Sequence, residues 1–128
     1  MNWNRIRWGV IFCLLGVVLG AFGAHTLETL LSPDRLESFT TGVRYQFLHG
    51  LALLFLGLLS QQVQSNLLTW TARLLIGGTI LFSGSIYLLS CRDILGLTNI
   101  GWLGPITPLG GTLLIVGWAL LLVQTFRK

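Results

Sequence analysis

The chain has 128 residues, of which 53% are hydrophobic and only 9% are charged. An average soluble domain carries about a quarter charged residues, so this chain has too few charges to cover a surface in water. The composition excludes a disordered chain, a disulfide scaffold and an ordinary soluble enzyme, and it indicates an all-α integral membrane protein. The net charge of +4 comes from basic residues scattered singly at segment ends, which excludes nucleic acid as a partner.

Charged residues divide the chain into windows that are long enough to cross a membrane. A spanning helix needs about 20 mostly apolar residues, and four such windows lie at about 8–27, 43–61, 70–91 and 105–126. We therefore predict a single domain, residues 1–128, that folds as a four-helix bundle in the membrane. The alternative for the first window is a cleaved signal peptide after Arg5 and Arg7. A retained span is favoured, because the apolar stretch from Trp8 to Ala24 is longer than a typical signal-peptide core.

The connections between the windows carry local signals of their own. Ser32, Pro33 and Asp34 have the order of a helix cap, a first-turn proline and a first-turn acid, which predicts a short interfacial helix before the second span. The segment from Thr98 to Pro108 contains two glycines and two prolines. Because these residues interrupt regular helices, a loop is predicted there.

Four spans place both termini on one side of the membrane, and the basic residues indicate which side. Five of them fall on the side of the termini and three on the other. Cytoplasmic ends are enriched in Lys and Arg, so both termini are predicted to face the cytoplasm from a plasma or inner membrane. Four of the five tryptophans lie at predicted span ends, where their rings favour the depth of the lipid headgroups.

Glycine is abundant, with 16 residues, and small residues let membrane helices approach one another closely. The glycines predicted to form packing faces are Gly16, Gly20, Gly23, Gly84, Gly110, Gly111 and Gly117. Residues 77–84 and 110–117 also match at five of eight positions, as they would in an inverted repeat. A coincidence of common membrane residues is favoured, because the first two spans show no matching repeat.

Polar residues inside the predicted spans are the candidates for a functional site. At about 1.5 Å of rise per residue, they fall within a turn or two of the predicted outer boundary. They therefore predict one polar layer near the outer face and an apolar inner half. The predicted layer consists of His25, Tyr45, Gln46, His49, Ser83, Tyr87 and Thr107.

Several kinds of chemistry could use this layer. His25 and His49 are the only histidines and could ligate a haem iron, and Ser83 with His49 could act as nucleophile and base in an intramembrane protease. Both patterns are weak, because lone histidines and helix serines usually form structural hydrogen bonds. A proton or solute path through the spans would lack an acidic residue at mid-span. Cys13 and Cys91 are predicted to lie too far apart for a disulfide. We therefore expect no enzyme activity, no cofactor and no metal.

Groups of motif residues are spread along nearly the whole chain. They are Gly20-Ala21-Phe22-Gly23-Ala24-His25, Thr41-Gly42, Tyr45-Gln46, His49, Phe82-Ser83-Gly84-Ser85, Tyr87, Thr107-Pro108-Leu109-Gly110-Gly111 and Gly117-Trp118. Together these motifs resemble the YgdD-like membrane family, domain-of-unknown-function family 423, which includes a mitochondrial transmembrane relative in animals. The resemblance implies a small membrane protein of four helices, and it brings no established reaction, substrate or cofactor. Residues 91–103 look longer than the family's usual connection, so the resemblance implies no role for them.

These features favour a non-enzymatic, multi-pass membrane protein that serves as a structural or accessory subunit of a membrane complex. The expected partners are membrane lipid and either a larger membrane protein complex or further copies of the chain. The alternative is a small-ligand-binding or transport protein that uses the polar layer near the outer face.

Overall fold

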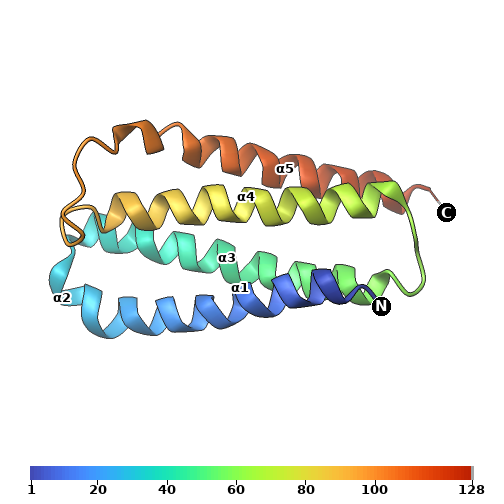
Figure 1. Ribbon diagram of the computed structural model, residues 1–128, viewed down its shortest axis with the longest axis horizontal. Coiled ribbons are helices and arrows are strands. Elements are labelled where there is room, and N and C mark those ends of the chain that lie inside the picture. Colours follow the sequence, from blue (N-terminus) through green and yellow to red (C-terminus); the bar gives the residue numbers. More distant parts are fainter. Residues whose placement is uncertain (128) are drawn as a thin grey trace.

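The computed structural model describes residues 1–127, and every regular element in this range is helical. Figure 1 shows four long helices side by side, with both termini at one end of the molecule, which we call the terminal end. The helices are α1 (Trp3–Phe22), α3 (Pro33–Leu59), α4 (Asn66–Ser90) and α5 (Ile106–Thr125). With their helical extensions, all four are long and apolar enough to cross a membrane, which confirms the predicted all-α membrane fold.

The first helical segment begins before its two arginines. Asn2 caps α1, because its side-chain oxygen accepts the backbone N–H of Arg5 at 3.2 Å. At the other end α1 continues through a π-helical turn, η1 (Gly23–Leu27), into the short α2 (Glu28–Leu30). Arg5 therefore lies inside the helix instead of preceding it.

The second span is longer than its apolar core. Ser32 accepts the Arg35 N–H at 3.4 Å as the cap, and Pro33 occupies the first turn, as the sequence predicts. The prediction of a separate interfacial helix is wrong, because α3 runs unbroken from Pro33 to Leu59. Arg44 does not end the helix, since its exposed side chain is long enough to carry the charge away from the apolar surface.

The last two helices are joined by an irregular connection. Ser65 caps α4 by accepting the Leu68 N–H at 3.2 Å, and residues 91–100 lead to a 3-10 turn, η2 (Gly101–Leu103). Gly96 and Asn99 have φ values of 67° and 58° in this connection, a left-handed conformation that favours these two residue types. The predicted loop ends at Pro105, because Thr107 and Pro108 already belong to the first turn of α5, where proline is tolerated.

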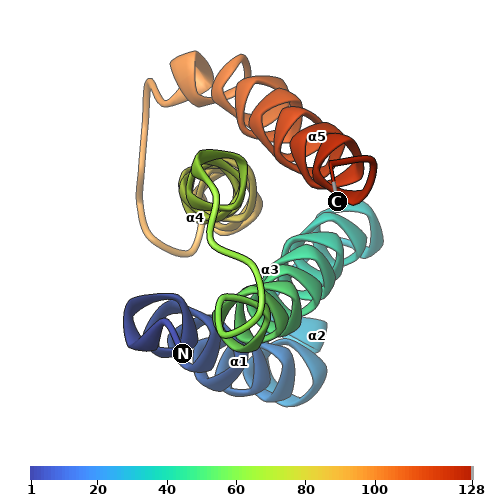
Figure 2. The same cartoon turned by 90° about the vertical axis from the view of Figure 1, so that its right-hand side faces the viewer.

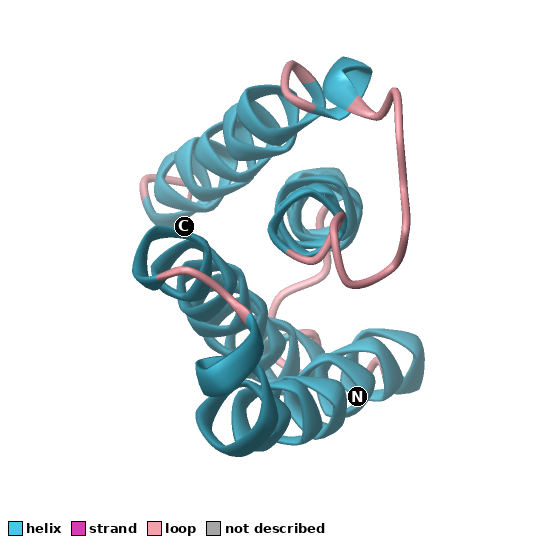
Figure 3. Cartoon of the chain, turned by 90° about the vertical axis from the view of Figure 1, so that its left-hand side faces the viewer, coloured by secondary structure: helices cyan, strands magenta, loops and turns pink. Residues whose placement is uncertain are grey.

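The four helices form two hairpins joined through α4. Helix α1 packs on α3, and α5 packs on α4, while α4 also contacts α3. Figure 2 shows α4 between the α1–α3 pair and α5, and Figure 3 shows the same arrangement from the opposite end. The shared core is apolar and draws on all four long helices, with Leu53 and Leu56 of α3 and Leu75 of α4 fully buried and Phe12 of α1 and Leu114 of α5 packed among them.

Each hairpin crosses at a pair of glycines. A Cβ atom on Gly9 of α1 would lie 2.7 Å from the carbonyl oxygen of Gly50 in α3, which is closer than real Cβ contacts occur. A Cβ on Gly110 of α5 would lie 3.0 Å from the carbonyl oxygen of Gly78 in α4. Glycine therefore sets the backbone distance within both hairpins.

The predicted packing glycines differ in how closely they are packed. Cβ atoms on Gly16, Gly20, Gly23 and Gly117 would meet neighbouring side chains at 3.4, 3.4, 3.1 and 3.0 Å. Gly111 has only an ordinary contact, with the Phe82 ring at 3.7 Å. The prediction that Gly84 forms a packing face is wrong, because a Cβ atom there would meet nothing within 4 Å. This position of α4 points away from the neighbouring helices.

Candidate functional site

Gln46 is the centre of a buried polar cluster that joins three helices. Its Nε2 donates to the carbonyl oxygen of Phe12 in α1 at 3.0 Å, and its Oε1 accepts the hydroxyl of Tyr87 in α4 at 2.6 Å. The side chain is only 5% exposed. One amide thus satisfies both its oxygen and its nitrogen while linking α1, α3 and α4.

His49 lies one turn further along α3 and links it to α5. Its Nε2 accepts the indole N–H of Trp118 at 3.0 Å, and its Nδ1 lies 2.7 Å from the carbonyl oxygen of Tyr45. Because a carbonyl only accepts and an indole N–H only donates, this pattern assigns the proton of a neutral imidazole to Nδ1. The ring of Tyr45 packs against both His49 and Phe82, with centroid distances of 6.1 and 4.8 Å.

The hydroxyl groups of the cluster tie α4 to its two neighbours. Ser83 Oγ donates to the carbonyl oxygen of Gly42 in α3 at 2.7 Å, and Ser85 Oγ pairs with Thr107 Oγ1 of α5 at 2.6 Å. His49 is bonded to Tyr45 and Trp118 and not to Ser83. Ser83 and His49 therefore do not form with each other the nucleophile–base pair considered for an intramembrane protease.

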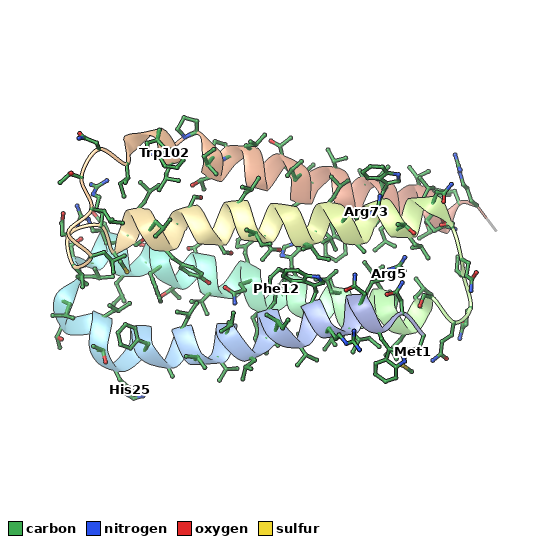
Figure 4. All side chains as sticks on the ribbon, in the orientation of Figure 1. Met1, Arg5, Phe12, His25, Arg73 and Trp102 are labelled. Carbon is green, nitrogen blue, oxygen red and sulfur yellow. The ribbon has the colours of Figure 1, made fainter. Side chains whose placement is uncertain are left out.

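The structure brings Tyr45, Gln46, His49, Ser83 and Tyr87 together at the contact between α3 and α4, whereas Thr107 pairs with Ser85 at the start of α5 and His25 lies apart. His25 is exposed on η1, and Figure 4 shows it on the side of α1 that points away from the other helices. Gly23 and Leu27, four residues apart, both face the bundle, so His25, two residues from each, lies on the opposite face of this helical segment. The predicted layer is wrong in this one residue, and His25 and His49 do not converge on a common haem site.

Gln46 and His49 lie deeper in the bundle than the sequence predicts, whereas Tyr87 and Thr107 lie within one turn of the ends of α4 and α5. Gln46 is the middle residue of α3, so it lies about 20 Å from each end of that helix. The sequence predicts a position near the outer face because the predicted second span begins ten residues after the true start of α3. The inner half is not apolar either, since Arg5, Thr71 and Thr79 are buried there. The cap signal of Asn2, three residues before Arg5, could have identified the arginine as part of the helix.

Other chemically active groups lie apart from this cluster. Within residues 1–127, no group of three or more His, Cys, Asp or Glu side chains could hold a metal ion. Cys13 and Cys91 are free thiols on different helical segments. Partial burial raises the pKa of the Cys91 thiol, which follows the last residue of α4, so less of it is present as the reactive thiolate.

A groove lies between α3 and α5, beside Tyr45 and His49. Its volume is about 400 Å³. Its lining is mainly apolar and includes Tyr45, His49, Phe82, Gly111, Ile115 and Trp118. Ile115 is 70% exposed and Trp118 is 42% exposed. The groove therefore opens to the surroundings of the bundle, partway along the membrane-spanning helices.

The bond between His49 and Trp118 should be measurable as a coupling energy. We expect a double-mutant cycle of His49→Ala and Trp118→Phe to give about 0.6 kcal/mol, the usual size for hydrogen bonds between membrane helices. The free energy of unfolding in mixed micelles provides the measurement. Trp70→Phe, an exposed position on α4, serves as the control and should show no coupling to His49. Strictly additive effects of His49→Ala and Trp118→Phe would contradict the bond.

Comparison with known proteins identifies the family. The model of the family described as "Protein of unknown function (DUF423)" matches residues 19–111. The chain is 43% identical to the UPF0382 membrane protein of Staphylococcus saprophyticus over 119 residues, which cover 93% of each chain. It is also 40% identical to the UPF0382 membrane protein YwdK of Bacillus subtilis over 120 residues, again 93% of each chain. No solved structure matches it. The chain therefore belongs to the DUF423 family and is a multi-pass integral membrane protein.

Proposed function

We propose that this protein is a non-enzymatic accessory subunit of a larger membrane complex, and that the groove between α3 and α5 receives an apolar transmembrane helix of a partner protein. The observation that carries the proposal is the open groove itself. Helix α5 packs on α4, and the groove separates it from α3 along the faces that carry Tyr45 and Ile115. In an isolated chain, membrane lipid would fill this space.

The polar cluster favours a binding role over catalysis. Gln46, His49 and Ser83 each hold a hydrogen-bond partner within the bundle. A catalytic nucleophile or base has to exchange such bonds for contacts with a substrate. Mutually satisfied groups instead fix the positions of the helices, and so preserve the shape of the groove between them.

The shape of the groove fits a helix. Gly111, Ile115 and Trp118 recur at intervals of four and three residues and so share one face of α5. Gly111 lies in this face with room to spare, because its nearest neighbour is the Phe82 ring. A glycine of this kind allows the backbone of a second helix to approach closely, as is common between membrane helices.

A photoreactive amino acid placed in the groove tests the proposal. We expect it at position 115, in cells, to give one discrete cross-linked protein of higher mass, and not a series of lipid adducts. Position 17 on α1 is the control, because Val17 is 60% exposed but does not line the groove. Cross-linking to lipid alone at position 115, or the same cross-linked protein from both positions, would contradict a partner helix in the groove.

The aromatic lining of the groove favours a second candidate, a small-ligand-binding or transport protein. Tyr45, Phe82 and Trp118 supply ring faces and edges, and His49 lies among them. Such a lining suits a planar, lipid-soluble molecule. In this case the cross-link at position 115 should add the mass of a small molecule instead of a protein.

A further inference from the structure

We propose that a recess at the terminal end binds a phosphate-bearing anion, either the headgroup of an anionic phospholipid or free phosphate. The recess has a volume of about 270 Å³. It lies where α1 and α4 begin and α3 ends, at the opposite end of α3 from its cap Ser32. Its polar lining consists of Asn2, Arg5, Ser60, Gln64, Ser65 and Thr69.

Arg5 gives the recess a fixed and incompletely bonded positive charge. The residue is only 8% exposed, and Figure 4 shows it at the terminal end of the bundle. Its Nη1 donates to the Leu56 carbonyl oxygen at 3.5 Å and its Nη2 to Thr69 Oγ1 at 3.2 Å. Both bonds are long for a guanidinium, and within residues 1–127 they use two of its five N–H donors. The remaining donors are available to a ligand in the recess.

No acidic side chain balances this charge. The polar lining contains none, and the acids of the chain are Glu28, Asp34, Glu37 and Asp93. All of these belong to segments at the other end of the bundle, where Asp93 pairs with Arg35. Removing an unpaired charge from water is costly, and a bound anion would offset that cost through charge-assisted hydrogen bonds.

Two helix N-termini and one helix C-terminus meet at the recess, so the positive partial charges of α1 and α4 outnumber the negative one of α3. Asn2 and Ser65, the caps of α1 and α4, both line it. Both helices are long, and the N-terminal end of a helix carries a partial positive charge that favours phosphate. The predicted orientation would place this end at the cytoplasmic headgroups.

The alternative to ligand binding is a purely structural role for Arg5. Its bond to the Leu56 carbonyl oxygen helps to cap the C-terminal end of α3. However, the same oxygen already accepts the Ser60 N–H at 3.2 Å. The cap therefore does not require the guanidinium, and it leaves the charge of Arg5 without an acidic partner.

Thermal unfolding of the full chain in a neutral detergent tests the site. Three probes are titrated separately: short-chain phosphatidylglycerol, short-chain phosphatidylcholine and inorganic phosphate. We expect phosphatidylglycerol to raise the Tm of the wild type more than phosphatidylcholine does. In Arg5→Gln the apparent affinity for phosphatidylglycerol should fall about tenfold. Arg7→Gln is the matched control, because Arg7 is exposed on the same turn of α1, and it should keep the wild-type response.

The arms of this titration distinguish the sources of the anion. A shift with phosphatidylglycerol alone assigns the site to a lipid headgroup, and a shift with inorganic phosphate that depends on Arg5 assigns it to the free ion. Equal responses of Arg5→Gln and Arg7→Gln would overturn the proposal. If Arg5→Gln does not fold, the wild-type protein alone still tests the proposal. Equal Tm shifts with the two lipids, together with no Tm shift with inorganic phosphate, would also overturn the proposal. Arg5→Lys, which keeps the charge, should retain part of the response.

Discussion

Replacing Gly110 with alanine should lower the free energy of unfolding by about 3 kcal/mol. A Cβ atom at this position would lie 2.4 Å from the backbone nitrogen of Phe82 and 2.8 Å from its Cα. Both atoms belong to the backbone of α4, so no side-chain rotation can relieve the clash. The substitution has to push α5 away from α4, and these two helices form an extensive contact with each other. Unfolding by increasing SDS in mixed micelles, followed by circular dichroism, provides the measurement.

Gly84→Ala is the matched control for this experiment. It introduces the same methyl group into α4, but a Cβ there meets nothing within 4 Å. Alanine is a better helix former than glycine by about 0.5–1 kcal/mol, so Gly84→Ala should be neutral or slightly stabilising. Equal losses of stability in the two variants would show that the α4–α5 contact is not set by Gly110.

Replacing Gln46 with alanine should cost about 2 kcal/mol of unfolding free energy. The substitution removes the bonds to Phe12 in α1 and to Tyr87 in α4, and it leaves the Tyr87 hydroxyl without that partner. Each bond between membrane helices is worth about 0.6 kcal/mol, and the cavity adds to the loss. The same SDS titration measures the effect.

Two further variants separate the contributions at Gln46. Gln46→Met keeps most of the side-chain volume but loses both hydrogen bonds, so it should fall between the wild type and Gln46→Ala. Gln61→Ala removes an exposed glutamine from the turn after α3 and should leave stability unchanged. A Gln46→Ala variant as stable as Gln61→Ala would contradict the role of Gln46 as a link between three helices.

The number and order of the membrane helices could be predicted from the sequence, because long apolar windows require helices in lipid. The caps at Ser32 and Asn2 have local signals as well, since both residue types are favoured at helix N-caps. The helix start at Ser32 is predicted correctly, but the sequence does not show that this helix continues without a break into the second span. A charged residue such as Arg44 does not mark the end of a membrane helix, because its long side chain can remain on the helix and carry the charge outward.

Contacts between helices could be predicted only in part. The residue types of the polar cluster were identified, but their pairing depends on which helices are neighbours, and the bond from His49 to Trp118 was not foreseen. The prediction for His25 is wrong because it rests on depth alone: His25 is two residues from the buried Gly23, about 200° around a helix, and so points away from the bundle. The Gly9–Gly50 and Gly78–Gly110 crossings likewise involve separate helices, so glycine spacing within one helix could not reveal them.

Native mass spectrometry of the protein extracted gently from its own membrane tests the role of the groove most directly. The comparison is between the wild type, Gly111→Leu and Gly77→Leu. Leucine at position 111 would fill the groove, whereas position 77 on α4 does not line it and a Cβ there meets nothing within 4 Å. The proposed role predicts a second, different protein chain bound to the wild type and to Gly77→Leu but lost from Gly111→Leu. A bare chain in the wild type, or equal retention of that partner by both variants, would contradict it.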